Sequence, residues 1–243
     1  MLPLLIALQF LGSLPIRLPA MPTPQQQGRS LLCYPLVGML FGTLLWLAAL
    51  LLAGAPPLLQ AALLLTLWVA LSGALHLDGL ADSADAWLGG FGDRQRTLAI
   101  MKDPRSGPLA VVVLVLVLLL KFSALHALLE AGEYAALLLA PLLGRSALPA
   151  LFLCTAYVRP NGIGQALAAN LPRVAAQWLL VGVAMACLLF GSSGLIALLV
   201  AAATFASVRR AMLRRLGGTT GDTAGALLEL VECAVLVGLA VQR

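Results

Sequence analysis

The chain has 243 residues, of which 61% are hydrophobic and 10% are charged, and its mean hydropathy is +1.01. Soluble domains contain about 45–50% apolar residues, so the composition excludes a soluble globular protein and indicates a polytopic membrane protein. The formal charge of +5 comes from bases spread over several loops, which is typical of membrane-topology determinants rather than of a nucleic-acid-binding surface.

The first apolar stretch, Leu2–Leu14, covers about half of a bilayer as a helix, so we expect a re-entrant or interfacial segment there. A polar, proline-containing connector follows it. The later apolar runs predict about seven transmembrane helices, of which the sixth is short. Their expected ranges are Leu31–Ala53, Leu58–Leu77, Leu109–Leu129, Tyr134–Val158, Val174–Phe190, Leu195–Val208 and Ala224–Val241. The predicted fold class is therefore all-α, a polytopic helical protein in which residues 1–243 form a single integral membrane domain.

The connectors alternate between long basic segments and short turns without bases. The basic connectors are Leu14–Ser30, Asp78–Pro108, Arg159–Arg173 and Arg209–Thr223, whereas the turns read GAPP, EAGE and GSSG. The positive-inside rule places the basic connectors in the cytoplasm. We therefore expect a multi-pass protein of a bacterial inner membrane whose active site faces the cytoplasm. A transporter, which needs polar access from both sides, is disfavoured by this asymmetry.

The most informative connector is 76–108, which reads HLDGLADSADAWLGGFGDRQRTLAIMKDPRSGP and holds five of the six aspartates. Asp78, Asp82 and Asp85 are spaced i, i+4 and i+7, so a helix would place all three carboxylates on one face. Like charges in this arrangement repel unless a cation lies between them, and hard oxygen ligands suit Mg²⁺. Asp103 follows on the same connector. The competing interpretation is a solvated helix start whose acids pair with neighbouring bases.

The same connector carries bases suited to an anionic substrate. Arg94, Lys102 and Arg105 could bind phosphate, the arginines through bidentate contacts and the lysine as a point charge. Acids for a metal beside bases for phosphates indicate phosphoryl transfer. His76 is a candidate general base, with a purely structural role at a helix end as its alternative.

Two further arginines are candidates for substrate binding. Arg145 lies in mid-span between Pro141 and Pro149, where it must find an acid or a substrate phosphate, or else extend along a kinked helix to the interface. Arg159 opens the turn RPNGIG, which can form an anion-binding nest or be a plain loop.

The last cytoplasmic connector contains GGTTGD from Gly217 to Asp222. Gly217 and Gly218 form a flexible turn that opens a helix, where backbone N–H groups can face an anion, and Asp222 can either contact substrate or cap the helix. Glu229 and Glu232 lie on roughly the same helix face inside the final apolar span, so we expect them to need a cation or a basic partner.

Several of these segments together resemble the adenosylcobinamide-GDP ribazoletransferase family, also called cobalamin synthase. The resemblance covers most of the chain and rests on RLP at 17–19, GRSLLCYPLVGMLFG at 28–42, the aspartate connector, RPNGIG at 159–164 and GGTTGDTAGA at 217–226. It implies a Mg²⁺-dependent inner-membrane transferase of cobalamin biosynthesis. Members join adenosylcobinamide-GDP to α-ribazole or its 5′-phosphate and release GMP.

The resemblance also implies roles for the residues of the connector. Asp78, Asp82, Asp85 and Asp103 would hold the metal, and Arg94, Lys102 and Arg105 the pyrophosphate, while Asp82, Asp85 or His76 would help the attacking hydroxyl to lose its proton. The expected partners are the two substrates and the lipid bilayer, with self-association or association with other corrinoid-pathway enzymes as a further expectation and nucleic acid excluded.

Other interpretations remain open from the sequence. The DGLAD stretch with Gly89 and Asp93 partly resembles the metal motif of CDP-alcohol phosphatidyltransferases, although Asp82 replaces the arginine of that motif. A cation channel or transporter would use the aspartates to line a pathway. A structural membrane partner would tolerate Asp82→Asn and Asp85→Asn without effect.

Overall fold

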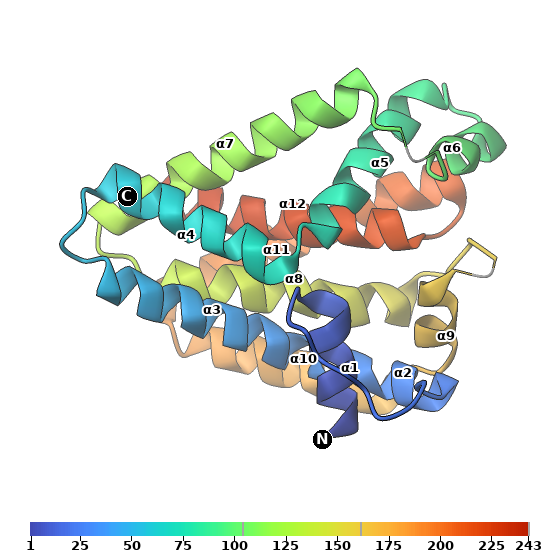
Figure 1. Cartoon of the computed structure of the whole chain (residues 1–243), viewed down its shortest axis with the longest axis horizontal. Helices are drawn as coiled ribbons and strands as arrows, with labels where there is room; N and C mark the ends of the chain where they lie inside the picture. The colour runs from blue at the N-terminus through green and yellow to red at the C-terminus, as the bar shows by residue number, and fades with distance from the viewer. Residues whose placement is uncertain (104, 161, 243) are drawn as a thin grey trace.

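The computed structural model describes residues 1–103, 105–160 and 162–242, and these fold into a bundle of helices with one isolated β-bridge (Figure 1). The elements are α1 Leu2–Leu11, α2 Pro24–Ser30, a 3₁₀ turn Leu31–Cys33, α3 Tyr34–Leu51, α4 Pro57–Ser72, α5 Leu75–Gly89, α6 Arg94–Ile100, α7 Pro108–Glu130, α8 Ala135–Cys154, α9 Ile163–Ala169, α10 Arg173–Leu188, α11 Gly191–Leu216 and α12 Gly221–Ala240. The all-α prediction is confirmed.

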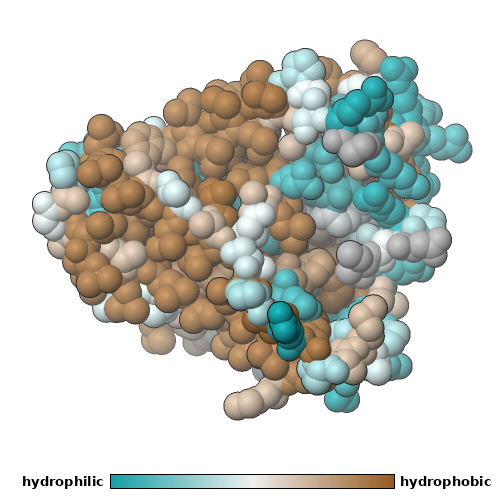
Figure 2. All heavy atoms as spheres, viewed as in Figure 1, coloured by the Kyte–Doolittle hydropathy of each residue, from teal (hydrophilic) through white to brown (hydrophobic). Residues whose placement is uncertain are grey.

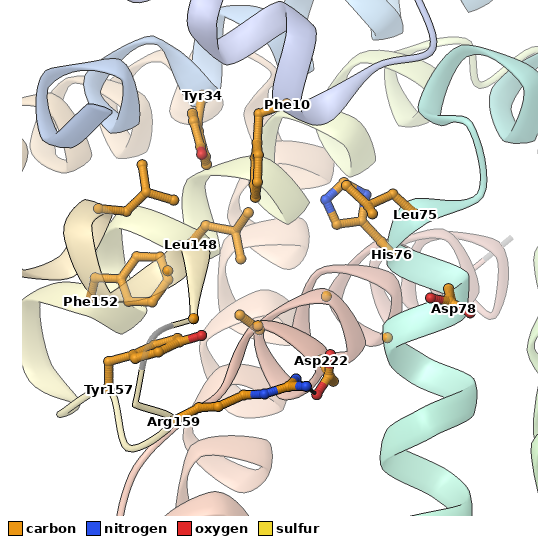
Figure 3. A pocket seen from close by; sticks show the side chains of 17 residues that line it. Phe10, Tyr34, Leu75, His76, Asp78, Leu148, Phe152, Tyr157, Arg159 and Asp222 are labelled. Atoms are coloured by element: carbon orange, nitrogen blue, oxygen red, sulfur yellow. Dashed lines mark hydrogen bonds and ion pairs between the residues drawn. The ribbon is translucent and has the colours of Figure 1, made fainter. Parts of the chain in front are cut away.

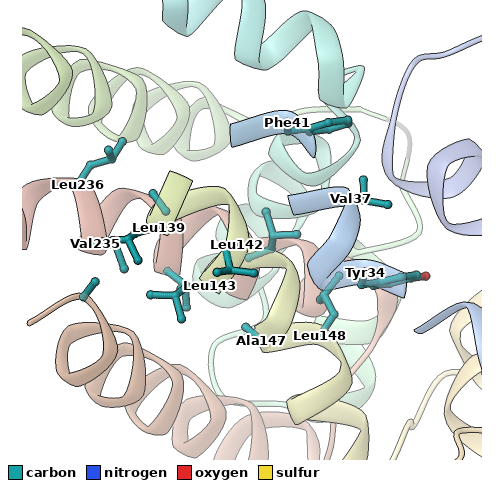
Figure 4. Close-up of a cluster of buried hydrophobic side chains, with 14 of the residues drawn as sticks. Tyr34, Val37, Phe41, Leu139, Leu142, Leu143, Ala147, Leu148, Val235 and Leu236 are labelled. Atoms are coloured by element: carbon teal, nitrogen blue, oxygen red, sulfur yellow. The ribbon is translucent and has the colours of Figure 1, made fainter. Parts of the chain in front are cut away.

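Helix α8 lies at the centre of the bundle and packs against α3, α10, α11 and α12. Apart from Arg145 and Ser146 it is apolar, as expected for a helix enclosed by other helices, and its leucines meet side chains of α3 and α12 (Figure 4). Gly38 and Gly42 of α3 face its backbone, where added Cβ atoms would lie 2.4 Å from the carbonyl oxygen of Pro141 and 2.8 Å from that of Leu137. This pair of glycines therefore permits the close approach of α3 to α8.

Within the described residues, five helical segments are long and apolar enough to cross a membrane, and a sixth crossing results if the bent pair α4–α5 counts as one span. The count of about seven from the sequence is thus approximate. The predicted short sixth span is wrong in detail, because α11 extends to Leu216 and has 26 residues. Helix α10, expected as a full span, has 16 residues and is one of the shorter apolar helices, and the N-terminal segment forms the ten-residue α1.

The predicted span Leu58–Leu77 is broken where α4 meets α5, and the two helices are bent by 88°. Gly73 ends α4 in the left-handed region with φ of 61°, and Ala74 follows with φ of 58°. Two successive left-handed residues cannot continue a right-handed helix, so the chain changes direction. As a result α5 runs toward one end of the bundle and packs along α12.

The surface is strongly asymmetric along the long axis of the molecule. Figure 2 shows hydrophobic residues over most of this face and hydrophilic residues gathered at the end that carries α5 and α6. The outward faces of α7 and α11 are largely exposed apolar residues. Such a broad apolar surface indicates burial in lipid, with the α5–α6 end in the aqueous phase.

Candidate functional site

A cavity of about 360 Å³ opens at this polar end between α5, the start of α12 and the loop after α8. Asp78 and His76 of α5 line one side, Asp222 of α12 lies below them, and Tyr157 and Arg159 reach in from the loop (Figure 3). The cavity thus combines residues of the aspartate connector, of RPNGIG and of GGTTGD, three segments that lie far apart in the sequence.

Two of these segments are joined by the parallel bridge between Tyr157 and Thr219. The backbone N–H of Val158 donates to the carbonyl of Thr219, and that of Thr219 donates to Ala156, both at 2.9 Å. At Gly218, an added Cβ would lie 2.3 Å from the carbonyl oxygen of Ala156. A side chain at this position would therefore clash with the backbone of the neighbouring loop.

Gly217 has a related backbone role, because it ends α11 with φ of 72° in the left-handed region that glycine adopts without strain. Neither Gly217 nor Gly218 lines the cavity. Both glycines were predicted to bind substrate. In the structure they instead allow the GGTTGD turn to pack against the loop after α8.

Asp222 is free to face the cavity because another residue caps its helix. The N-cap of α12 is Thr220, whose side chain accepts a hydrogen bond from the backbone of Thr223 in a capping box. The alternative in which Asp222 is the cap is therefore wrong. Asp222 instead forms an ion pair with Arg159 at 2.8 Å between Nη1 and Oδ2, and the two side chains are 18% and 27% exposed.

The carboxylates of Asp78 and Asp82 lie near the same ion pair. Asp82 is close enough to Asp78 and Asp222 for their charges to oppose its own, while Arg159 attracts it. The approach of α5 to α12 depends on Gly79, where an added Cβ would lie 2.8 Å from the backbone carbonyl of Asp222. Three carboxylates and one guanidinium therefore share one region, with an excess of negative charge.

Asp85 takes part in a different structure. Its carboxylate accepts hydrogen bonds from the backbone N–H groups of Gly107 at 2.5 Å and Ala110 at 2.9 Å. These are N–H groups at the start of α7, so Asp85 stabilises that helix terminus from a distant part of the chain. The shared helix face predicted for the three aspartates exists, but the geometry assigns Asp85 to the α7 start.

The outer part of the connector is exposed to solvent. Asp103 pairs with Arg105, with Oδ2 and Nη2 at 2.7 Å, and this guanidinium and the Arg105 backbone N–H lower the pKa of Asp103 to about 2. Arg94 and Lys102 are exposed on or beside α6. None of these four predicted site residues lines the cavity, so any contact they make with substrate lies outside it.

A second group of charges is buried among α7, α8 and α12. Lys121 Nζ lies 2.5 Å from Glu229 Oε2 and 2.8 Å from Glu232 Oε2, and Arg145 forms an ion pair with the other oxygen of Glu232. All four residues are buried, and the two positive charges balance the two negative ones. The expected need of the glutamates for basic partners is confirmed.

The partner of Arg145 is thus an acid of the protein, and its fully buried side chain does not line the cavity. His76 lies between the two groups. It lines the cavity, is 3% exposed, and is close enough to Glu229 and Arg145 for electrostatic interaction. Its Nδ1 has no hydrogen-bond partner within the part of the chain that the structure describes.

In the described ranges, no three His, Cys, Asp or Glu side chains converge closely enough to form a complete metal site. The carboxylates of Asp78 and Asp222, which line the cavity, and of Asp82 beside them are nevertheless hard oxygen donors. Mg²⁺ commonly binds through one or two protein carboxylates and completes its shell with water and substrate phosphates. This donor set therefore fits a magnesium ion that arrives with a phosphate-containing substrate.

Sequence reasoning assigned no role to the aromatic side of the cavity. Phe10 and Tyr34 come from the N-terminal part of the chain and Phe152 and Tyr157 from the end of α8 and the loop after it. Isolated aromatic residues in apolar runs look like ordinary membrane core. The one available signal for Tyr34 is its place within the segment GRSLLCYPLVGMLFG.

Fold and cavity together define a polytopic helical membrane protein with an acidic, arginine-containing site at its polar end. The chain belongs to the family described as cobalamin-5-phosphate synthase, whose sequence profile matches residues 3–240. It is 78% identical over 242 residues to the adenosylcobinamide-GDP ribazoletransferase of Stutzerimonas stutzeri, covering 100% of this chain and 99% of that relative. Relatives of the same name from Pseudomonas putida and Pseudomonas fluorescens are 70% and 69% identical, each covering 99% of both chains. No solved structure matches this chain.

The family assignment agrees with the resemblance found in the sequence. It favours the cobalamin synthase interpretation over the CDP-alcohol phosphatidyltransferase, channel and structural-partner alternatives, since the match extends over almost the whole chain.

Proposed function

We propose that this protein joins adenosylcobinamide-GDP to α-ribazole or α-ribazole 5′-phosphate, forms adenosylcobalamin or its 5′-phosphate, and releases GMP. The family and the names of its relatives support this reaction. At the level of residues, the proposal is supported by Asp78, Asp222 and Arg159, which line one cavity, and by Asp82, which is close enough to all three for electrostatic interaction. Acids that can hold a cation lie there beside a base that can bind phosphate.

The reaction requires an in-line displacement at phosphorus. A ribazole hydroxyl oxygen forms a bond to the phosphorus nearest the corrinoid, the bond from that phosphorus to the oxygen of GMP breaks, and GMP leaves with the electron pair. The proton of the hydroxyl passes to a nearby base, for which the candidates are the unprotonated nitrogen of His76, which lines the cavity, and Asp82, which lies close to Asp78 and Asp222. Arg159 is placed to bind a pyrophosphate oxygen once Asp222 engages another cation.

Magnesium is part of this proposal. One or two of the carboxylates of Asp78, Asp82 and Asp222 would hold it, and it would neutralise charge on the pyrophosphate as the leaving group develops. Asp85 supports the site indirectly, because it ties α5 to the start of α7. Arg94, Lys102 and Arg105 are exposed on or beside α6, outside the cavity, where they would meet the nucleotide part of the larger substrate.

We also propose that the protein lies in a bacterial inner membrane with this site toward the cytoplasm. Arg159 lines the cavity, and the α5–α6 connector with its four bases lies at the hydrophilic end of the molecule (Figure 2). The positive-inside rule favours a cytoplasmic location for that end. Both nucleotide-containing substrate and GMP product are cytoplasmic kinds of molecule, which agrees with this orientation.

The test is GMP release by detergent-purified protein supplied with adenosylcobinamide-GDP and α-ribazole. Omission of Mg²⁺ is expected to abolish release, and Asp82→Asn to lower kcat by about 10²-fold or more. Asp93→Asn is the matched control, because Asp93 lies in the same connector but caps α6 through the backbone of Arg96, and asparagine caps equally well. Full activity of Asp82→Asn, or full activity without divalent cations, would contradict the proposed site.

A further inference from the structure

The cavity has two chemically different sides. Asp78, Arg159 and Asp222 form a charged side, whereas Phe10, Tyr34 and Phe152 form an aromatic one, and Figure 3 shows the two sides facing across the same space. Phe10 and Tyr34 stack with ring centroids 6.3 Å apart at an interplanar angle of 19°. A ligand that matches this lining has a flat apolar ring system at one end and a polar group at the other.

The volume discriminates between the two substrates of the proposed reaction. A benzimidazole base with its ribose occupies roughly 300 Å³ at the packing density of proteins, close to the lower limit of ordinary ligand pockets. The cavity of about 360 Å³ can hold such a molecule. A corrin ring with its adenosyl and GDP groups needs roughly 1,000 Å³ or more and cannot enter as a whole.

Two buried polar atoms lie beside the cavity, on residues that line it. Nδ1 of His76 has no hydrogen-bond partner within the described residues, and the Tyr34 hydroxyl makes no hydrogen bond of good geometry there, with the Ser30 side chain beside it. Tyr34 and His76 are only 1% and 3% exposed. Buried polar groups of this kind are rarely left unsatisfied unless a ligand or water completes them. The aromatic base has a ring nitrogen that accepts a hydrogen bond, and the ribose has hydroxyl groups that both donate and accept.

We propose that this cavity is the binding site of the smaller substrate, α-ribazole or its phosphate, and that Tyr34 is a specificity-determining residue that donates a hydrogen bond to the aromatic base. The base lies on the side of Phe10 and Phe152, and the ribose points to Asp78 and Asp222. The larger nucleotide substrate then binds over the mouth of the cavity. This inference rests on the proposed function and adds to it the division of the site between the two substrates.

The experiment measures binding of each substrate separately to detergent-purified protein by titration calorimetry. Tyr34→Phe keeps the ring but removes the hydroxyl, so the Kd for α-ribazole is expected to rise about tenfold, the effect of losing one hydrogen bond. The Kd for adenosylcobinamide-GDP is expected to stay the same. Tyr134→Phe is the matched control, since Tyr134 lies just before α8 at the far end of that helix and does not line the cavity.

A second measurement does not depend on any variant. Free benzimidazole base is expected to compete with α-ribazole and not with adenosylcobinamide-GDP. The inference is overturned if Tyr34→Phe leaves the α-ribazole Kd unchanged, if both tyrosine variants weaken it equally, or if the free base displaces only the larger substrate. In these cases GMP release by the native protein still supports the proposed function. Failure of the native protein to bind either substrate removes both proposals together.

Discussion

The buried ion pair between Arg145 and Glu232 allows a quantitative test of what holds the helices together. Both side chains are 0% exposed, and together with Lys121 and Glu229 they form a group with no net charge. Arg145→Met leaves this group with one uncompensated negative charge, and Glu232→Met leaves one uncompensated positive charge. The double variant removes one charge of each sign and retains the Lys121–Glu229 pair.

The expected magnitudes follow from that arithmetic. Breaking a buried pair by removing one partner costs about 3–5 kcal/mol, so each single variant should lose this much free energy of unfolding. Replacing both partners by apolar groups of similar size is often close to neutral. We expect the double variant to lose at most about 2 kcal/mol, which corresponds to a coupling energy of at least about 4 kcal/mol between the two positions.

Reversible unfolding in mixed micelles, followed by circular dichroism, measures these differences for the native protein and the three variants. Additive losses, with the double variant equal to the sum of the singles within about 0.5 kcal/mol, would show that the pair is not coupled. That result would refute the assignment of Glu232 as the partner of Arg145.

Three further outcomes are expected. Gly79→Ala places a Cβ 2.8 Å from a backbone carbonyl of α12 and should lower kcat by tenfold or more, on the order of 1.4 kcal/mol. Gly182→Ala is the control and should leave kcat unchanged, because an added Cβ there has no neighbour within 4 Å. Equal activities of the two variants in the GMP assay would contradict the close crossing of α5 and α12. Asp85→Ala should reduce the melting temperature, because it removes an interaction of about 1 kcal/mol with the start of α7. Asp85→Asn should reduce the melting temperature less, because the amide oxygen still accepts a hydrogen bond. An equal fall in melting temperature for the two variants would exclude a capping role. The pKa of Asp103 is held at about 2 by Arg105, so this ion pair is present above the ordinary value of 3.8 and is lost only as the pH falls through about 2. Arg105→Gln should return the Asp103 titration, followed by NMR of labelled carboxyl carbon, toward the ordinary value, and an unchanged titration would refute the pairing.

The sequence predicts the helices of this protein better than their directions. Apolar runs of bilayer length identify α3, α7, α8 and α12 because hydropathy depends only on local composition. The run Leu58–Leu77 reads as continuous, however, and the bend after Ser72 depends on left-handed dihedral angles at Gly73 and Ala74. Glycine is common inside transmembrane helices, and alanine rarely adopts left-handed angles. The local sequence around Gly73 and Ala74 therefore does not identify the bend.

For the site, the sequence identifies the chemical groups but not their pairing. Asp78 and Asp82 were expected in the site and line or adjoin the cavity, yet Asp85 binds backbone groups that begin 22 residues later in the chain. Asp222 meets Arg159 across 63 residues. Both contacts depend on tertiary packing, which spacing within a single helix cannot reveal. The aromatic side of the cavity was not predicted, because Tyr34 and Phe152 look like membrane core until the packing of α1, α3 and α8 is known.

The buried charges also constrain the order in which the chain can be assembled during synthesis. Lys121 leaves the ribosome more than a hundred residues before its partners, since it lies 108 residues before Glu229 and 111 before Glu232. An ionised lysine is costly in the middle of a bilayer. We therefore expect α7 to reach its stable depth only after translation of α12, and Lys121 to stay at a shallower position or within the insertion machinery until then. On this expectation, the packing of the bundle is completed only when α12 supplies Glu229 and Glu232 to Lys121.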